Sequence, residues 1–491
     1  MHTHLKIFFS PPAFCHFTSH MYFLFIACCL LPVASFSQSI TFEKYYDTIN
    51  CYNGQCVQQT FDKGYIITGT HSVYAGNNNL VILKTDSFGN PQWLKSYGGT
   101  NNDGGEFVQQ TLDSGYIVVG ERDAISSTDS KIWLLKTDKN GDTIWTKAIT
   151  AGIGANLSTC IQLTTDGGYI ISGYTSAKGA GSYDVFLVKT NSTGDTLWTK
   201  IFGGPDADVS NFVGQTNDGG YIVVGSYMYS NFSKDVYLIK TNSNGDSLWT
   251  KKFGGSRTDV GQSVKQTSDG GYIIAGETTS FKDTIGWDIY LIKTDVNGDT
   301  LWTKDLFDTA SSNAYSIEIK SDGGYIIIGD NSGNPNGAVY IVRTNSAGDT
   351  LWTKSYGQGH AMAWSGTTTS DGGCIVTGQF DKYSPYSIYL LKTDSLGFAV
   401  TGINEAFSIK NNISIYPNPF SLSATVIVPE EFRKKNTRYE IIDLLGNSVY
   451  NNEMRIGNES FIIEKGNIVR GIYFLKIFSN SHIAIVKMVV Q

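Results

Sequence analysis

Histidine is too scarce in this sequence to build the common catalytic and metal sites. The 491 residues contain seven histidines, and four of them lie within the first twenty positions. His482 lies near the C-terminus, so a Ser-His-Asp triad would have to use His71 or His360, and neither stands in a recognisable motif. A zinc site needs several clustered His or Cys ligands. The sequence therefore predicts no metal site and no histidine-dependent catalytic residue.

Carboxylates could support chemistry without histidine, because glycosidases need only two Asp or Glu side chains at a suitable separation. Many Asp residues precede a Gly-Gly pair, where an Asp commonly accepts hydrogen bonds from its own turn. The better candidates are acids outside this pattern: Glu106, Glu121, Asp123, Glu277 and Glu318. No pairing among them follows from the sequence. We therefore name no catalytic residue, and a carboxylate-dependent glycoside hydrolase or lyase is kept as an alternative.

A recurring Thr-Asp-x-Asn-Gly-Asp segment carries oxygen ligands of the kind that Ca²⁺ prefers. Its second position alternates between Asp and Asn, however, as at Asp138 and Asn191, and no twelve-residue loop with a terminal Glu is present. Hairpin turns explain these segments more simply, since Gly supplies the left-handed conformation that such turns need. No metal and no cofactor is predicted here.

Aromatic residues in variable segments are the strongest candidates for binding. Segments such as 227–234, 278–287 and 380–386 mix Tyr, Phe and Trp with Ser, Asn and Asp. That mixture suits stacking on sugar rings with polar contacts to hydroxyls, and it equally suits a protein interface. The residues expected to contact a ligand are Tyr229, Phe232, Trp287, Trp364, Tyr383 and Tyr386. Of these, Trp364 is expected in the last loop that connects one repeat to the next.

A tandem repeat of about fifty residues must position these segments. A Tyr after a Gly recurs six times with spacings of 49 to 53 residues, and Cys374 takes the seventh place: Tyr65, Tyr116, Tyr169, Tyr221, Tyr272 and Tyr325. Each copy contains four short runs rich in β-branched and aromatic residues, separated by turn signals. Four strands per copy, repeated seven times, predict an all-β, seven-bladed β-propeller.

The ends of the repeat indicate how the ring closes. The seventh copy stops after its third strand, and the missing fourth strand has its counterpart in residues 41–44, where Phe42 takes the place of a recurring Trp. We therefore expect an N-terminal strand to complete the last blade. This closure leaves no open sheet edge at the ends of the ring.

The motif TD-x-NGD-x-LWTK-x-FGG resembles the tryptophan-docking repeat of quinoprotein-type propellers over residues 38–398. The resemblance implies that six Trp residues pack each blade against its neighbour: Trp93, Trp145, Trp198, Trp249, Trp302 and Trp352. The vicinal cysteines of the quinoproteins are missing after residue 37, so the resemblance extends to the scaffold and not to a quinone cofactor.

The C-terminal segment, residues 410–491, has a different composition and resembles the type A sorting domain of type IX secretion substrates. The resemblance is carried by Tyr416-Pro417-Asn418-Pro419-Phe420, by the run 439–450 and by Gly471-Ile472-Tyr473-Phe474-Leu475-Lys476. It implies a small Ig-like sandwich, the type IX secretion machinery as a partner, and release or surface attachment outside a Gram-negative cell. The alternation of apolar and polar residues also fits an antiparallel sandwich.

The first 37 residues read as a signal peptide. An apolar run at 22–33 is followed by Ala34 and by small residues placed for a cut before Gln38, which is too short a pattern for a membrane span. Translation could start at Met1 or at Met21, and a lipid attachment at Cys28 is a further alternative. Four cysteines follow, of which Cys51 and Cys56 could pair or remain small buried residues.

These observations define four parts: a signal peptide (1–37), a propeller (38–398), a linker (399–409) and a sorting domain (410–491). The net charge of −7 without a basic run gives no electrostatic basis for binding nucleic acid, and no transmembrane helix is expected after the signal peptide. The leading interpretation is a non-catalytic, secreted or surface-exposed binding propeller for a polysaccharide or a protein. The alternatives are the glycoside hydrolase or lyase and a structural surface protein.

Overall fold

The structure is a computed structural model. It describes residues 40–46, 51–74, 77–122, 130–229, 232–281, 286–306, 311–331, 338–357, 360–381, 386–399, 413–428, 433, 437–443, 448–453, 459–478 and 483–491. The expected signal peptide, Tyr383, His482 and nearly all of the expected linker lie outside these ranges, as does the side chain of Cys51.

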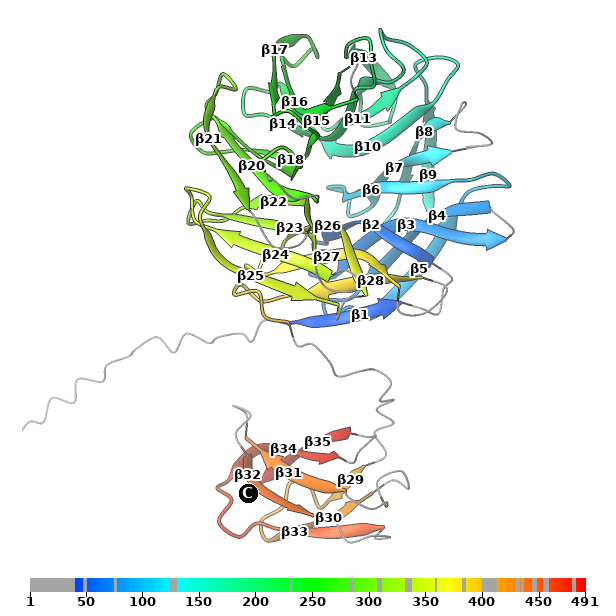
Figure 1. The fold of residues 1–491 in the computed structure, drawn as a ribbon. Helices are drawn as coiled ribbons and strands as arrows, with labels where there is room; N and C mark the ends of the chain where they lie inside the picture. The colour runs from blue at the N-terminus through cyan, green and yellow to red at the C-terminus, as the bar shows by residue number, and fades with distance from the viewer. Residues whose placement is uncertain are drawn as a thin grey trace, which may run out of the picture. The chain divides into compact units, whose positions relative to one another are not determined.

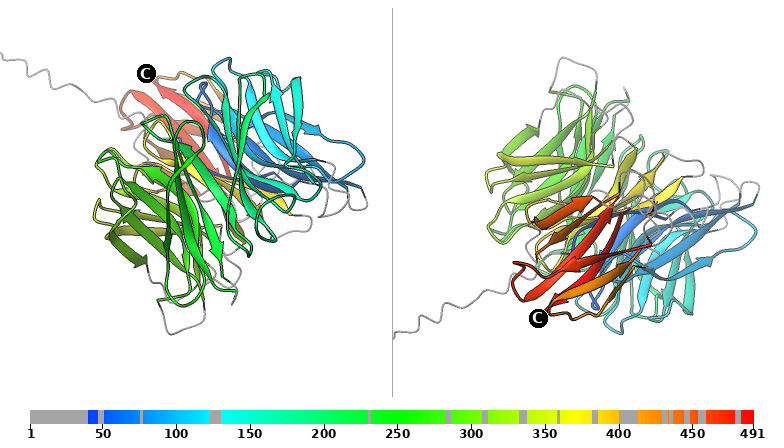
Figure 2. Two further views of the ribbon diagram at one scale, coloured as in Figure 1. Left: turned by 90° about the horizontal axis from the view of Figure 1, so that it is seen from above. Right: turned by 90° about the horizontal axis from the view of Figure 1, so that it is seen from below.

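Seven antiparallel four-stranded sheets form the blades of a β-propeller, which confirms the predicted fold class. The blades follow one another around a central axis, with β6, β10 and β22 toward the middle of the ring (Figure 1). Viewed from above and from below, each blade is a twisted sheet (Figure 2).

The strands take the same four places in every blade. The innermost strands are β2 (Cys51–Gln59), β6 (Gly104–Gln110), β10 (Asn156–Leu163), β14 (Val209–Gln215), β18 (Asp259–Gln266), β22 (Ser312–Ile319) and β26 (Ala361–Thr368). The second strands are β3 (Tyr65–Tyr74), β7 (Tyr116–Arg122), β11 (Tyr169–Thr175), β15 (Tyr221–Met228), β19 (Tyr272–Thr278), β23 (Tyr325–Asn331) and β27 (Cys374–Phe380). The third strands are β4 (Asn77–Thr85), β8 (Lys131–Thr137), β12 (Asp184–Thr190), β16 (Lys234–Thr241), β20 (Asp288–Thr294), β24 (Ala338–Thr344) and β28 (Ser387–Lys392). The outer strands are β5 (Pro91–Tyr97), β9 (Thr143–Ile149), β13 (Thr196–Phe202), β17 (Ser247–Phe253), β21 (Thr300–Leu306), β25 (Thr350–Tyr356) and β1 (Phe42–Tyr46).

Burial explains why the four strand types differ in sequence. The third strands are covered on both faces by neighbouring blades and are buried along their whole length in β12, β20 and β24. Their sequences are accordingly almost continuous apolar runs. The outer strands alternate between exposed and half-buried residues, as expected for an edge strand with one covered face.

An ion pair between a buried cation and a partly exposed Asp fixes the turn between the first two strands of every blade. In the third blade Asp166 accepts hydrogen bonds from Gly168 N (3.0 Å) and from Lys189 Nζ, whose ammonium lies 2.9 Å from the second carboxylate oxygen. Partial burial raises the pKa of Asp166, but hydrogen bonds from Thr164 and Lys189 outweigh it and hold the pKa at about 2. The equivalent pairs join Asp62 to Lys84, Asp113 to Lys136, Asp218 to Lys240, Asp269 to Lys293, Asp322 to Arg343 and Asp371 to Lys392.

The six recurring Trp side chains lie at the seams between blades. In five seams the indole faces the recurring Tyr of the next blade at a centroid distance of 5.8 to 6.4 Å. In all six, a Cβ added to the turn Gly of the next blade would lie 2.5 to 2.9 Å from the indole. These glycines have φ between +75° and +81°, so both the backbone and the close approach require Gly.

Strand β1 closes the ring as the sequence predicts. It pairs antiparallel with β28, with Phe42 opposite Lys392 and Tyr46 opposite Ile388. Phe42 takes the place of the docking Trp, 5.8 Å from the ring of Tyr65 in the first blade. The ring is therefore held shut by hydrogen bonds and packing, with strands from both ends of the propeller in one blade.

The C-terminal segment forms a small two-sheet sandwich. One sheet contains β29 (Ser414–Tyr416), β30 (Ser423–Ile427) and β33 (Ser460–Glu464), and the other contains β31 (Arg438–Ile442), β32 (Ser448–Glu453), β34 (Gly471–Phe478) and β35 (Ile483–Val490). Its core is separate and includes Phe420, Ile441 and Leu475. Within the described residues, no helix has the length and apolar content needed to span a membrane.

Candidate binding channel

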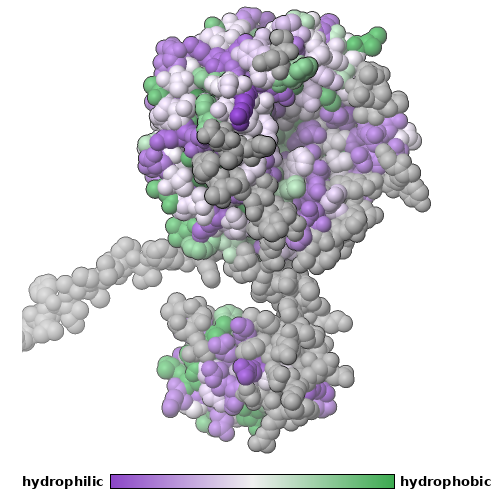
Figure 3. Space-filling model, in the orientation of Figure 1, coloured by the Kyte–Doolittle hydropathy of each residue, from purple (hydrophilic) through white to green (hydrophobic). Residues whose placement is uncertain are grey.

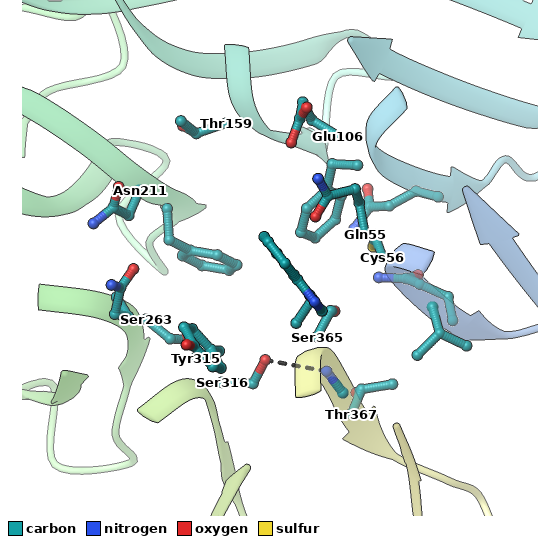
Figure 4. Close-up of a pocket in the computed structure, with 18 of the residues that line it drawn as sticks. Gln55, Cys56, Glu106, Thr159, Asn211, Ser263, Tyr315, Ser316, Ser365 and Thr367 are labelled. Atoms are coloured by element: carbon teal, nitrogen blue, oxygen red, sulfur yellow. Dashed lines mark hydrogen bonds between the residues drawn. The ribbon is translucent and has the colours of Figure 1, made fainter. Parts of the chain in front are cut away.

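The seven innermost strands surround a central cavity of about 430 Å³. Every residue that lines it comes from one of these strands. Figure 4 shows labelled side chains from different blades, such as Glu106, Asn211 and Tyr315, around one common space. The cavity is therefore built by all seven blades together.

A β-bulge in each innermost strand contributes one residue to the channel. These residues form what is called here the upper level, which lies nearer the longer connections than the second level does. At one equivalent position in every blade the pairing register between the first and second strand skips a residue, which has no cross-strand partner; β2 has a second register shift, between Cys51 and Asn53. These seven residues, called here the bulge ring, are Gln55, Glu106, Thr159, Asn211, Gln262, Tyr315 and Trp364, and all of them line the cavity. They lie near the beginning of each strand, toward the face that carries the longer connections.

The seven positions of the bulge ring are equivalent in the fold, but their side chains differ in chemistry. The residue before each bulge is always Gly, Ser or Ala, and at Gly261 an added Cβ would collide with Val224. The bulge residue itself is an amide, an acid, a hydroxyl or an aromatic. The sequence contains the signal, because this residue always stands ten places before the recurring Tyr or Cys374. We did not predict these seven residues as a set, because we compared the loops that differ among the repeats. We did not compare a single position within a strand.

Trp364 is the one predicted binding residue that lines the cavity. Our sequence interpretation placed it in a loop, but it lies in strand β26 at the bulge, with its side chain 42% exposed. The bulge turns it toward the channel, since a bulged residue leaves the regular alternation of the strand.

A second level of the channel lies three residues further along each strand, toward the short turns. It is formed by Gln58, Gln109, Gln162, Lys265, Glu318 and Thr367, and the equivalent residue of the fourth blade, Gly214, does not line the cavity. Lys265 Nζ lies 3.1 Å from Glu318 Oε1, which also accepts a hydrogen bond from the Thr367 hydroxyl (2.9 Å). Gln109 donates to Gln162 Oε1 at 2.6 Å. The polar side chains of this level thus form hydrogen bonds largely with one another.

Glu106 gives the upper level an unusual acid. Burial, and secondly the nearby Glu121 carboxylate, raise the pKa of Glu106 to about 7, and burial raises the pKa of Glu121 to about 7 as well. Glu106 follows the bulge-flanking Gly105 on β6, and Glu121 lies on the adjacent strand β7, opposite Gly104. Glu106 thus lines the channel, and the carboxyl group of Glu121, which does not line it, lies near enough to raise the pKa of Glu106.

A second pair of acids lies beside the bulge ring on the fifth and sixth blades. Gln262 donates a hydrogen bond to Glu277 Oε1 (3.3 Å), and burial raises the pKa of Glu277 to about 7. Asp330 accepts hydrogen bonds from Asn313 (2.8 Å) and from the Tyr315 hydroxyl (3.3 Å). These acids hold two bulge residues in place.

The other predicted binding residues lie away from the cavity, at the longer connections. The Tyr229 hydroxyl donates to Asp235 Oδ2 at 2.8 Å, while Phe232 is 81% exposed in a left-handed turn. Trp287 is half-buried immediately before β20, and Tyr386 is exposed immediately before β28. The structure does not bring these four residues together with Trp364 in the cavity.

Histidine and cysteine add no reactive centre. His360 Nδ1 lies 3.1 Å from Asp381 Oδ1 as an isolated pair. Cys56, Cys160 and Cys374 are buried thiols. Within the described part of the chain, no group of three or more His, Cys, Asp or Glu side chains is arranged to hold a metal ion.

The predicted sorting motif fastens the start of the C-terminal domain to its last strand. Asn418 donates from Nδ2 to Lys487 O (2.9 Å) and accepts from Val489 N (2.8 Å). Phe420 N donates to Val489 O (3.0 Å), and the Phe420 side chain is buried. Pro417, Pro419 and Tyr416 form the exposed bend before it, and Gly471 begins β34.

Comparison with known proteins identifies this domain. Residues 414–491 match the family described as secretion system C-terminal sorting domain. The match confirms the predicted type IX secretion signal, so the protein is exported to the cell surface or beyond the cell by the type IX machinery. The propeller is its exported cargo.

The chain is also similar, at low sequence identity, to other proteins. The Regulatory protein FlaEY of Caulobacter vibrioides is 24% identical over 256 residues, covering 47% of this chain and 24% of that protein, so the chain spans about a quarter of the relative's length. The β-propeller domain of the Trilobed protease from Pyrococcus furiosus is 10% identical with a TM-score of 0.42, covering 72% of this chain and 98% of that one. A puromycin hydrolase mutant complexed with PGG is 13% identical with a TM-score of 0.47, and the match covers 77% of this chain and 58% of that one.

Proposed function

We propose that this secreted propeller is a non-catalytic glycan-binding protein and that its central channel holds the sugar. The observation that carries the proposal is the bulge ring, in which seven equivalent positions direct different side chains into one cavity. Positions that serve only the scaffold, such as the docking Trp, are nearly constant among the blades. Divergence at cavity-facing positions of a rigid frame supports a binding role.

The chemistry of the ring suits a saccharide. Trp364 and Tyr315 offer aromatic surfaces on which a sugar ring can stack, and Gln55 and Asn211 offer amides for its hydroxyl groups. Phe232, Trp287, Tyr229 and Tyr386 would extend the contact along the outer connections for a longer chain. On the face drawn in Figure 3, the described residues form a largely polar surface with scattered apolar residues.

The test is a glycan-array screen of the purified chain, followed by calorimetry on the glycans that bind. We expect Trp364→Ala to weaken binding at least about tenfold, because an aromatic contact contributes on the order of 1 kcal/mol beyond its buried area. Trp364→Phe keeps a ring and should retain most of the affinity.

The matched control is Leu112→Ala, which removes a 91% exposed side chain from the face of short turns. It should bind like the parent protein. Phe232→Ala distinguishes the channel from the outer connections, since it should weaken long glycans and spare short ones. Absence of binding to any glycan would contradict the proposal and favour a protein ligand.

A carboxylate-dependent glycoside hydrolase is the second candidate, and the raised pKa of Glu106 favours it. A carboxyl group with a pKa of about 7 can act as a general acid, and Glu318 lines the same cavity. Incubation of bound glycans with the protein, with measurement of new reducing ends, decides between the two. Release of reducing ends that stops in Glu106→Gln would establish catalysis.

A further inference from the structure

We infer that the channel selects saccharides that carry an ammonium group, that is, oligosaccharides of amino sugars. This inference rests on the proposed glycan-binding function and names its ligand class. The site is the upper level of the cavity, between Glu106 and the aromatic side chains of the bulge ring.

The charges that line the cavity leave one acid without a counterion. Three charged side chains line it, and two of these, Lys265 and Glu318, neutralise each other across 3.1 Å. Among the described residues, Glu106 has no cationic partner within ion-pair distance, and neither has Glu121 behind it. A ligand that enters this level therefore meets an acid whose ionised form no cation of the described chain neutralises.

The channel already contains an ammonium group bound in the way we infer for the ligand. Lys265 Nζ is paired with a carboxylate and lies 5.6 Å from the centroid of the Phe212 ring. Carboxylate and aromatic faces together are a common means of holding a cation. At the upper level Glu106, Tyr315 and Trp364 offer the same two kinds of group, and no protein ammonium pairs with that carboxylate in the described chain.

The surrounding acids make the preference for a cation stronger. Glu277 and Asp330 contact bulge residues of the fifth and sixth blades, and Lys234 is the basic residue that acts on Glu277. The acidic side chains beside the bulge ring thus outnumber the basic ones, so an acidic sugar finds few cations there and is repelled by each acid that is ionised.

An amino sugar fits better than a metal ion or a simple ammonium ion. The cavity of about 430 Å³ is far larger than an ion, and calcium would need six or more oxygen ligands gathered around one point. The remaining ring members, Gln55, Thr159, Asn211 and Gln262, provide amides and a hydroxyl suited to sugar hydroxyl groups.

The experiment compares two ligands of equal length, a glucosamine oligosaccharide and its fully N-acetylated counterpart, by calorimetry at neutral pH and low salt. Acetylation removes the charge and retains the sugar ring. We expect the charged oligosaccharide to bind at least tenfold more tightly, and we expect added salt to reduce its affinity and to leave that of the acetylated form nearly unchanged.

Variants then assign the preference to the acid. Glu106→Gln should remove most of the preference for the charged ligand and its salt dependence. Asn211→Ala, at the equivalent bulge of another blade, should weaken both ligands and leave their ratio unchanged. Equal affinity for the two ligands, or a preference that survives in Glu106→Gln, would overturn the inference and leave glycan binding intact. If neither ligand binds but other glycans do, or if a basic peptide binds more tightly than the charged oligosaccharide, the inference also fails. Loss of all glycan binding would remove the proposed function as well.

Discussion

At the scale of single residues, Glu106 should cost the propeller stability at neutral and alkaline pH. Its pKa is raised from 4.5 to about 7 in the folded chain, chiefly by burial and then by Glu121. Between these two pH values the folded state binds more protons than the unfolded state, so stability falls as pH rises through this window. Glu106→Gln removes the ionisation. We expect a higher melting temperature than the parent at pH 8 and little difference at pH 4, measured by thermal unfolding.

An aspartate with the opposite shift provides the control. Partial burial raises the pKa of Asp218, but hydrogen bonds, with Lys240 first, outweigh it and hold the pKa at about 2. Asp218→Asn should therefore lower the melting temperature at pH 8, and this effect should become smaller as pH falls below about 4. If both variants shift stability in the same direction at pH 8, the environment assigned to Glu106 is wrong.

At the scale of elements, the seam between blades depends on glycines that face the docking Trp. Gly245 has φ of +79°, and an added Cβ would lie 2.6 Å from the Trp198 ring. Gly219, in a different turn of the same blade, has φ of +78° and no atom within 4 Å of an added Cβ. Gly245→Ala should destabilise the protein by about 1–3 kcal/mol more than Gly219→Ala, because only the first change adds overpacking to the backbone cost. Equal losses of unfolding free energy in the two variants, measured by chemical denaturation, would show that the seam accommodates the added methyl group without a packing penalty.

The elements also show how far the sequence can be interpreted. The strands, the turns and the closure through Phe42 can be predicted from the repeat, because a residue that recurs in each copy is one that the scaffold requires. The bulges do not follow in this way, because an extra residue in one strand changes the pairing and leaves no compositional mark. This is why Trp364 was expected in a loop. The partnership of Glu106 with Glu121 likewise depends on the twist of two strands, which spacing does not give.

At the scale of the whole molecule, the ion pair that recurs in every blade determines how low the pH can fall before the propeller unfolds. The turn Asp of the second, third, fourth and fifth blades has a pKa of about 2, because hydrogen bonds outweigh the effect of partial burial. A carboxylate with a pKa lowered from 3.8 stabilises the fold above about pH 4, and this contribution is lost as pH falls toward 2.

Because neighbouring blades pack on one another around the whole ring and β1 closes it by hydrogen bonds and packing, loss of several pairs should release the blades together. We expect one cooperative unfolding transition of the propeller between about pH 4 and pH 2, followed by tryptophan fluorescence of the docking residues. Lys189→Met removes one cation and leaves Asp166 half-exposed and unpaired. It should raise the midpoint pH of acid unfolding, since the pKa of Asp166 moves back toward its ordinary value. A midpoint that is unchanged in this variant would mean that acid unfolding begins elsewhere in the ring.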